Sequence, residues 1–296
     1  MHTSRLIASG SFVAMLALSA GPAFADGGGN CSSLSNQAAM LKSALTKSIV
    51  SANGGLGNNK WGVIVDNSGI VCAVAFSGAN YTSQWLGSRV IAAQKANTGN
   101  SYSLGVGSGG TVIAISSAEL FSAVQPGGSL YGLQHSNPVD TAVAYGNQYG
   151  QGQGNPPAPA STFGTPQDPM VGQRIGGVNV FGGGLALYQG GVRVGGLGVS
   201  GDQSCTDHMV AWRTRNYLGL DGFTSGVSGP AALFNKDPPH PDNIIFDINA
   251  NTDGTGATGQ SPTGDGGVGQ SASGFGHPKC YNNPTAAAVS GLLAVH

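Results

Sequence analysis

The side chains best able to bind a metal or move a proton are two histidines that lie near glycine-rich motifs. His208 follows a glycine-rich segment ending at Gly201, and His135 follows Tyr131 shortly after a Pro-Gly-Gly sequence. A neutral imidazole is the commonest metal ligand in proteins and titrates near neutral pH. His208 and His135 are therefore the candidate metal ligands, although isolated histidines more often serve as hydrogen-bonded loop residues.

A nucleophilic site has weaker support. Ser204, Asp207 and His208 are the residue types of a hydrolase triad, but they share one short segment, whereas triad members converge from distant parts of a chain. The sequence also lacks the G-x-S-x-G nucleophile elbow. If the protein is an enzyme, Lys95, Arg89 and Asp66 are the residues expected to carry its chemistry.

Two further motifs resemble ligand loops but lack their defining partners. Residues 247–254 place oxygen side chains at alternate positions before a glycine, as calcium loops do, yet the twelfth position counted from Asn249 is Gln260 and not a glutamate. Residues 196–201 match G-x-G-x-x-G, but they follow a predicted hairpin strand and not a βαβ unit. We expect neither calcium in the C-terminal tail nor a dinucleotide.

The elements that must position the histidines centre on a predicted hairpin over residues 176–201. Apolar residues alternate along it, and Gly190-Gly191 supplies a tight turn. Gly195, Gly196 and Gly198 lie inside its second strand, where each glycine lowers stability by roughly 0.5–1 kcal/mol relative to alanine. Strand glycines indicate a bulge, another backbone nearby or a ligand against the sheet. We interpret this hairpin as the floor of a binding site or of a subunit contact.

Helices and hairpins alternate along the chain. A second hairpin is predicted from strands at 61–66 and 70–76, and helices are predicted at 30–52, 84–96, 117–125 and 206–218. This alternation favours an α+β fold, with an antiparallel sheet covered by helices. The second helix carries Lys95 and Arg89, which could bind a carboxylate of a ligand, although helix cations more often form ordinary ion pairs.

Composition divides the chain into three parts. Residues 1–25 combine a charged start, a short apolar run and an Ala-x-Ala cleavage motif, which predicts a secretory signal peptide. A domain is expected over residues 26–221, interrupted by a long polar insertion at 137–174. Residues 222–296 predict an irregular, low-complexity C-terminal extension, anchored at Ile244-Ile245-Phe246 and near Cys280.

Charge and cysteine content limit the partners and the compartment. Charged residues make up only 8% of the sequence, with a net charge of −1, so we expect neither nucleic-acid binding nor membrane insertion. An even number of cysteines in an exported chain predicts two disulfides, and four cysteines allow three pairings. We favour Cys31–Cys72 and Cys205–Cys280. The mature protein is expected in the periplasm or outside the cell.

Several short motifs occur in a fixed order between about Leu34 and Leu220. They are Gly62-Val-Ile-Val-Asp66, Asn67-Ser-Gly69, Ala92-Ala-Gln-Lys95-Ala96, Pro126-Gly-Gly128 before Leu130-Tyr131-Gly132, Phe181-Gly-Gly-Gly184 and Gly195-Gly-Leu-Gly-Val-Ser-Gly201. In this combination the chain resembles the GlcG/HbpS family of haem-binding-type proteins. The resemblance implies a profilin-like α+β fold, a tendency to form oligomers and, in some members, binding of haem or a related corrinoid. Some relatives hold the haem iron through a histidine of the first helix, and residues 30–52 contain none.

The resemblance and the strand glycines lead to one main functional expectation. The protein is expected to be exported, to form a homo-oligomer and to bind a flat tetrapyrrole, haem, in a binding or sensing role, with His208 or His135 as the iron ligand. The expected cofactor contacts are the two histidines, the strand glycines and three polar side chains: His208, His135, Gly195, Gly196, Gly198, Lys95, Arg89 and Tyr131. The alternatives are a small-molecule or haem-modifying enzyme and an oligomeric structural or sensory partner without a ligand.

Overall fold

The core of the protein is a four-stranded antiparallel sheet. The computed structural model describes residues 31–51, 53–105, 112–145, 158–223, 227–248 and 271–296. The predicted signal peptide and most of the calcium-like motif lie outside these ranges. The strands lie in the order β2 (Val71–Phe76), β1 (Trp61–Asp66), β4 (Val192–Ser200) and β3 (Gly184–Gln189), and each neighbouring pair is antiparallel. This arrangement confirms the expected α+β class.

The sheet is built from two hairpins. The first joins β1 (Trp61–Asp66) to β2 (Val71–Phe76), and the second joins β3 (Gly184–Gln189) to β4 (Val192–Ser200). The second turn uses Gly190-Gly191, with φ of 58° and 78°, the left-handed conformation that a two-residue hairpin loop requires.

The second hairpin is shorter than predicted. Its first strand begins at Gly184, although the alternating apolar pattern predicts extended structure from residue 176. Gly177 and Gly183 have φ of 77° and 112°, which breaks an extended strand. Val178 and Val180 are nevertheless buried, because they pack in a separate small cluster with Leu120.

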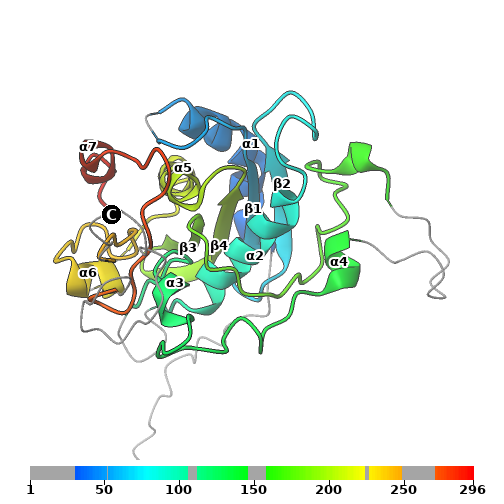
Figure 1. Cartoon of the computed structure of the whole chain (residues 1–296). Coiled ribbons are helices and arrows are strands. Elements are labelled where there is room, and N and C mark those ends of the chain that lie inside the picture. Colours follow the sequence, from blue (N-terminus) through cyan, green and yellow to red (C-terminus); the bar gives the residue numbers. More distant parts are fainter. Residues whose placement is uncertain (1–30, 52, 106–111, 146–157, 224–226, 249–270) are drawn as a thin grey trace, which may run out of the picture.

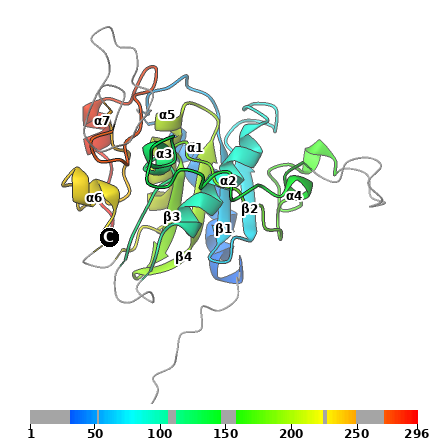
Figure 2. The same ribbon diagram turned by 60° about the horizontal axis from the view of Figure 1, so that its bottom comes forward.

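Helices cover both faces of the sheet (Figures 1 and 2). One face carries α2 (Ser88–Ser101), and the other carries α1 (Ser35–Ile49) and α5 (Ser204–Tyr217). The side chains of β1 alternate accordingly: Val63 and Val65 pack in the α2 layer, and Ile64 packs in the α1–α5 layer.

The remaining helices are short. A 3-10 turn η1 (Cys31–Leu34) precedes α1, and the predicted helix at 117–125 is reduced to α3 (Leu120–Ala123). The predicted helix at 84–96 begins later, at Ser88, because Trp85–Gly87 form a turn in which the Ser88 N–H donates to the Trp85 carbonyl.

The insertion at 137–174 contains α4 (Thr141–Tyr145) and a 3-10 turn η2 (Ala160–Thr162). It contributes to the core, because Met170 and Ala144 are buried beside α2.

The described parts of the C-terminal extension pack against α5. They contain α6 (Pro230–Phe234) and α7 (Ala286–Ser290), and Ile244 and Ile245 are buried as the anchor prediction requires. Both favoured disulfides, Cys31–Cys72 and Cys205–Cys280, are present. None of the described helices has the length and hydrophobicity of a membrane-spanning segment.

Candidate functional site

The strand glycines lie against the protein's own backbone and not against a ligand. A Cβ atom at Gly198 would lie 1.8 Å from the carbonyl oxygen of Ala92, and one at Gly196 would lie 2.1 Å from that of Ala96. Both carbonyls belong to α2. A Cβ atom at Gly195 would lie 2.1 Å from the Val65 carbonyl oxygen of β1.

The expected cofactor contacts at Gly195, Gly196 and Gly198 are therefore wrong. Without side chains at Gly196 and Gly198, α2 packs directly on β4, and the helix occupies the space that a planar ligand would need. Of the three explanations for strand glycines, the structure supports close approach of another backbone.

Lys95 also forms a contact inside the protein. Its Nζ atom lies 2.9 Å from Oδ2 of Asp207 and 3.1 Å from the carbonyl oxygen of Val199, and its side chain is 1% exposed. Burial lowers the pKa of Lys95 and raises the pKa of Asp207 to about 6, because both charged forms lose hydration. Lys95 therefore links α2 to α5 and is not available to a ligand carboxylate, contrary to expectation.

Arg89 holds the insertion in place. Its Nε atom donates to Oδ2 of Asp168 over 2.8 Å, a second contact joins Nη2 to Oδ1, and the guanidinium lies 4.2 Å from the ring centre of Phe163. Both side chains of this ion pair are buried. The expected role of Arg89 in binding a ligand is therefore also wrong.

Asp66, the candidate acid of an enzyme, serves the first hairpin. Its Oδ1 atom accepts hydrogen bonds from the backbone N–H groups of Ser68 and Ile70, over 2.9 and 3.0 Å. The carboxylate is buried and fixes the turn. Asp66, Lys95 and Arg89 thus serve separate structural contacts and form no common site.

His208 is a core residue of α5. It is fully buried, and neither ring nitrogen has a hydrogen-bond partner. Burial and the positive charge of Arg215 lower its pKa to about 3, and the nearby Asn243 opposes this shift. The His208 ring is therefore enclosed by the protein and is not accessible from the surface.

His135 has the opposite environment. It is exposed, and its ring makes no hydrogen bond within the described part of the chain. The ring lies edge-to-face with Tyr131, with 6.2 Å between ring centres, and Tyr131 is 59% exposed. The two predicted contacts His135 and Tyr131 are thus brought together on the surface, apart from the hairpin and from His208.

A pair formed by the half-buried Ser204 and the buried His277 is not predictable from the sequence motifs. The Ser204 hydroxyl donates to Nε2 of His277 over 2.7 Å, and Nδ1 of His277 donates to the Pro278 carbonyl over 2.7 Å. Burial lowers the pKa of His277 to about 4, so its ring is neutral at neutral pH. The sequence groups Ser204 with its neighbours Asp207 and His208, whereas its partner lies 73 residues away, beside the disulfide at Cys280.

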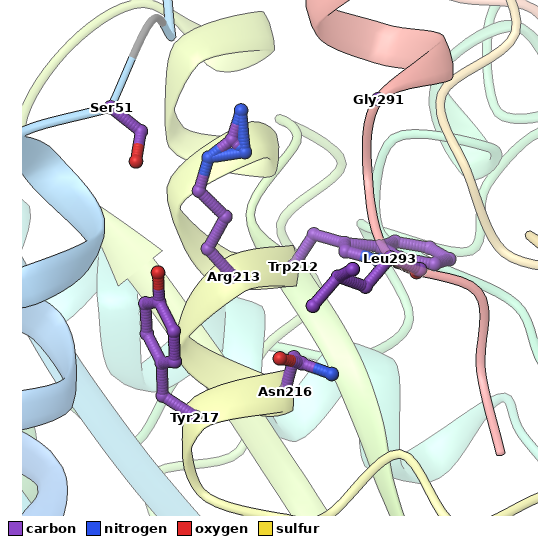
Figure 3. Close-up of a pocket in the computed structure, with 7 residues that line it drawn as sticks. All are labelled: Ser51, Trp212, Arg213, Asn216, Tyr217, Gly291 and Leu293. Atoms are coloured by element: carbon purple, nitrogen blue, oxygen red, sulfur yellow. Dashed lines mark hydrogen bonds between the residues drawn. The ribbon is translucent and has the colours of Figure 1, made fainter.

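The structure also contains a pocket of about 280 Å³ that the sequence did not predict (Figure 3). It lies between α5, the end of α1 and the chain after α7. Both polar and apolar residues line it: Ser51, Trp212, Arg213, Asn216, Tyr217, Gly291 and Leu293. No sequence signal could have found it, because the lining residues come from three distant segments.

Comparisons with known proteins give structural neighbours only. No family model matches the sequence, and no curated protein matches it. The solved structures that match include Klebsiella pneumoniae protein ORFY, described as DUF336 (21% identity, covering 62% of this chain and 88% of that one, TM-score 0.38). A PduOC:heme complex matches at 22% identity over 61% of this chain and 91% of that one, with a TM-score of 0.38. HbpS matches at 15% identity over 64% of this chain and 89% of that one, with a TM-score of 0.36. These matches include a DUF336 protein and HbpS, names of the family that the sequence motifs resemble, and at 15–22% identity they indicate a likeness of fold alone.

Proposed function

We propose that the protein binds a haem-type planar cofactor on the surface formed by Leu130, Tyr131 and His135. The observation that carries the proposal is the exposed imidazole of His135, which has no hydrogen-bond partner among the described residues and lies beside an exposed aromatic ring. A haem site needs an axial ligand and apolar contact for the ring. Tyr131 and the 37%-exposed Leu130 offer such contact.

The other described histidines fit this role less well. His208, His277 and His240 are 0%, 3% and 9% exposed. Both ring nitrogens of His240 are engaged, Nδ1 with Asp237 and Nε2 with the Leu292 carbonyl. His296 is exposed, but its Nδ1 atom contacts Asp221. His135 is thus the described histidine with an accessible and unengaged ring.

The loop that carries His135 is held by its own backbone. The N–H of Leu130 donates to the Ala123 carbonyl over 2.9 Å, and that of Ser136 donates to Gly132 over 3.0 Å. Leu133 packs against the small cluster that contains Leu120. A ligand side chain on such a loop loses little conformational freedom when it binds iron.

Bound haem would supply a redox-active iron centre, and the chain's own contribution would be an imidazole ligand and an aromatic wall. The exposed position of His135 leaves one side of the cofactor to solvent or to a second copy of the chain, which agrees with the expected homo-oligomer. Two disulfides suit an oxidising compartment, so we include export through residues 1–25 in the proposal.

The test is a titration of the purified chain, without residues 1–25, with hemin. We expect a shifted Soret band at micromolar concentrations, loss of the shift in His135→Ala and retention in His296→Ala, which removes the other exposed histidine. No shift in the parent protein, or an equal shift in His135→Ala, contradicts the proposal. Light scattering with and without hemin identifies an oligomer that forms without a ligand, and turnover of added haem identifies an enzyme.

A further inference from the structure

The pocket beside α5 contains a cation that the rest of the described chain leaves unpaired. The Nε atom of Arg213 is buried and has no hydrogen-bond partner, and its guanidinium forms no ion pair with any described residue. Burial lowers the pKa of Arg213, since the charged form loses hydration. A buried donor of this kind calls for an acceptor, because buried polar groups in folded proteins are nearly always hydrogen-bonded.

The other described arginines all have acceptors. Arg89 and Arg215 donate to the carboxylates of Asp168 and Asp242, respectively. Arg174 donates to the Ser68 carbonyl, and Arg193 donates to the Asn100 carbonyl. Arg213 is the exception among them, and it is the one that lines the pocket.

The neighbours of Arg213 suit a small anion. The hydroxyl groups of Ser51 and Tyr217 point into the space beside the Arg213 side chain (Figure 3). No acidic side chain is among the described residues that line the pocket. The carboxylate of Asp221 is not part of the lining and already accepts from the Asn216 amide over 2.8 Å. Lys47 is not part of the lining, and its Nζ atom lies 3.9 Å from the ring centre of Tyr217.

We propose that this pocket binds a small organic carboxylate, which the Arg213 guanidinium would hold through two parallel hydrogen bonds. A planar guanidinium matches the geometry of a carboxylate. One unpaired charge in the lining balances a monoanion, and the exposed side chain of Leu293 offers apolar contact to the carbon skeleton. The volume, about 280 Å³, is near the lower end of ligand cavities and restricts the ligand to a small molecule. This site is independent of the haem proposal, because it shares no residue with the His135 surface.

The experiment uses benzoate and acetate as probes, with phosphate and chloride as further anions. Binding to the full mature chain is followed by calorimetry. We expect saturable binding of benzoate, weakened about tenfold or more in Arg213→Met, since hydrogen bonds to charged groups are among the strongest in proteins. The matched control is Lys47→Met, which removes a nearby positive charge that is not part of the lining and should change the affinity by less than about threefold.

Tyr217→Phe removes only a hydroxyl group and keeps the test valid if Arg213→Met fails to fold, as judged by circular dichroism. We expect this variant to bind benzoate several-fold more weakly. Absence of saturable carboxylate binding, equal affinity in Arg213→Met, or an equal loss in Lys47→Met overturns the proposal. Binding of phosphate without binding of either carboxylate also overturns it.

Discussion

Lys95 and Asp207 form a buried ion pair that joins the helices on opposite faces of the sheet, with 2.9 Å between Nζ and Oδ2. The contact passes the end of β4, where Lys95 also donates to the Val199 carbonyl. The lysine is on α2 and the aspartate is in the first turn of α5. The two covering layers are therefore connected electrostatically at one end of the sheet.

We expect the removal of either partner alone to destabilise the protein strongly. Lys95→Met or Asp207→Asn should each lower the free energy of unfolding by about 3–5 kcal/mol, because a buried charge or donor is left without its partner. The double variant Lys95→Met/Asp207→Asn should lose less than the sum of the two single changes. Urea unfolding measures all three. The exposed Lys42→Met serves as control, and equal losses for it and Lys95→Met would contradict the expectation.

The close packing of α2 on β4 predicts that one added methyl group strongly lowers the stability of the protein. Gly198→Ala places its Cβ atom 1.8 Å from the Ala92 carbonyl oxygen, so the helix must move away from the sheet. We expect a loss of about 3 kcal/mol or more in the free energy of unfolding, or no folding at all. Gly87→Ala is the matched control, because Gly87 has a φ of −62° and open space around its Cβ position. Similar thermal unfolding of the two variants would rule out this explanation of the strand glycines.

His208 predicts a dependence of stability on pH. Its folded-state pKa is about 3, so the unfolded chain binds a proton near pH 6.5 and the folded chain does not. The stability that His208 contributes is therefore lost as the pH falls below 6.5, by about 3 kcal/mol at pH 4, since one pKa unit corresponds to about 1.4 kcal/mol. His277, with a folded-state pKa of about 4, also makes the protein less stable as the pH falls.

The comparison of His208→Leu with the parent protein isolates this contribution. Asp207, whose pKa is raised to about 6, changes the stability in the opposite direction: its contribution increases as the pH falls from 6 to 4. This contribution is the same in both proteins, so the comparison removes it. Since leucine fills most of the buried space of His208 and brings no titratable group, the variant should remain folded at pH 7 and lose less stability by pH 4. Urea unfolding at pH 7, 5.5 and 4.5 measures this, with the exposed His135→Leu as control. Parallel curves for His208→Leu and the parent protein would refute the prediction.

The disulfide between Cys205 and Cys280 should stabilise the C-terminal extension. Replacing both cysteines by alanine should lower the free energy of unfolding by about 2–5 kcal/mol. The bond closes a longer loop than Cys31–Cys72, 75 residues against 41, so its removal should have the larger effect. Proteolysis between residues 222 and 279, followed by reducing and non-reducing gels, tests the connection. Release of the Cys280 fragment without reductant would show that the link is absent.

Local sequence patterns predicted the sheet and its helices well, because hairpin turns and amphipathic stripes depend on neighbouring residues. The turn at Gly190-Gly191 and the strand Trp61–Asp66 are examples. The partners of Lys95 and Arg89 were not predictable in this way. Asp207 and Asp168 lie 112 and 79 residues away, and single-sequence patterns carry no information on such pairs.

The strand glycines illustrate the same limit. The sequence showed that Gly196 and Gly198 need something close to them, but a helix backbone and a ligand produce the same requirement. Similarly, the composition of residues 222–296 predicted little order beyond its two anchors, whereas the polar residues Asp242 and His277 are also buried against the domain. Those few residues contact α5 through tertiary interactions that overall composition does not report.

The ion pair between Arg215 and Asp242 has a consequence for how the protein is made. The Arg215 guanidinium is fully buried, and the carboxylate that neutralises it is synthesised 27 residues later. The Leu293 carbonyl, which accepts from the Trp212 indole, follows that residue by 81 positions. The environment of α5 is therefore complete only after the segment up to Leu293 has been synthesised, so the helix cannot reach its final packing while only the preceding part of the domain exists.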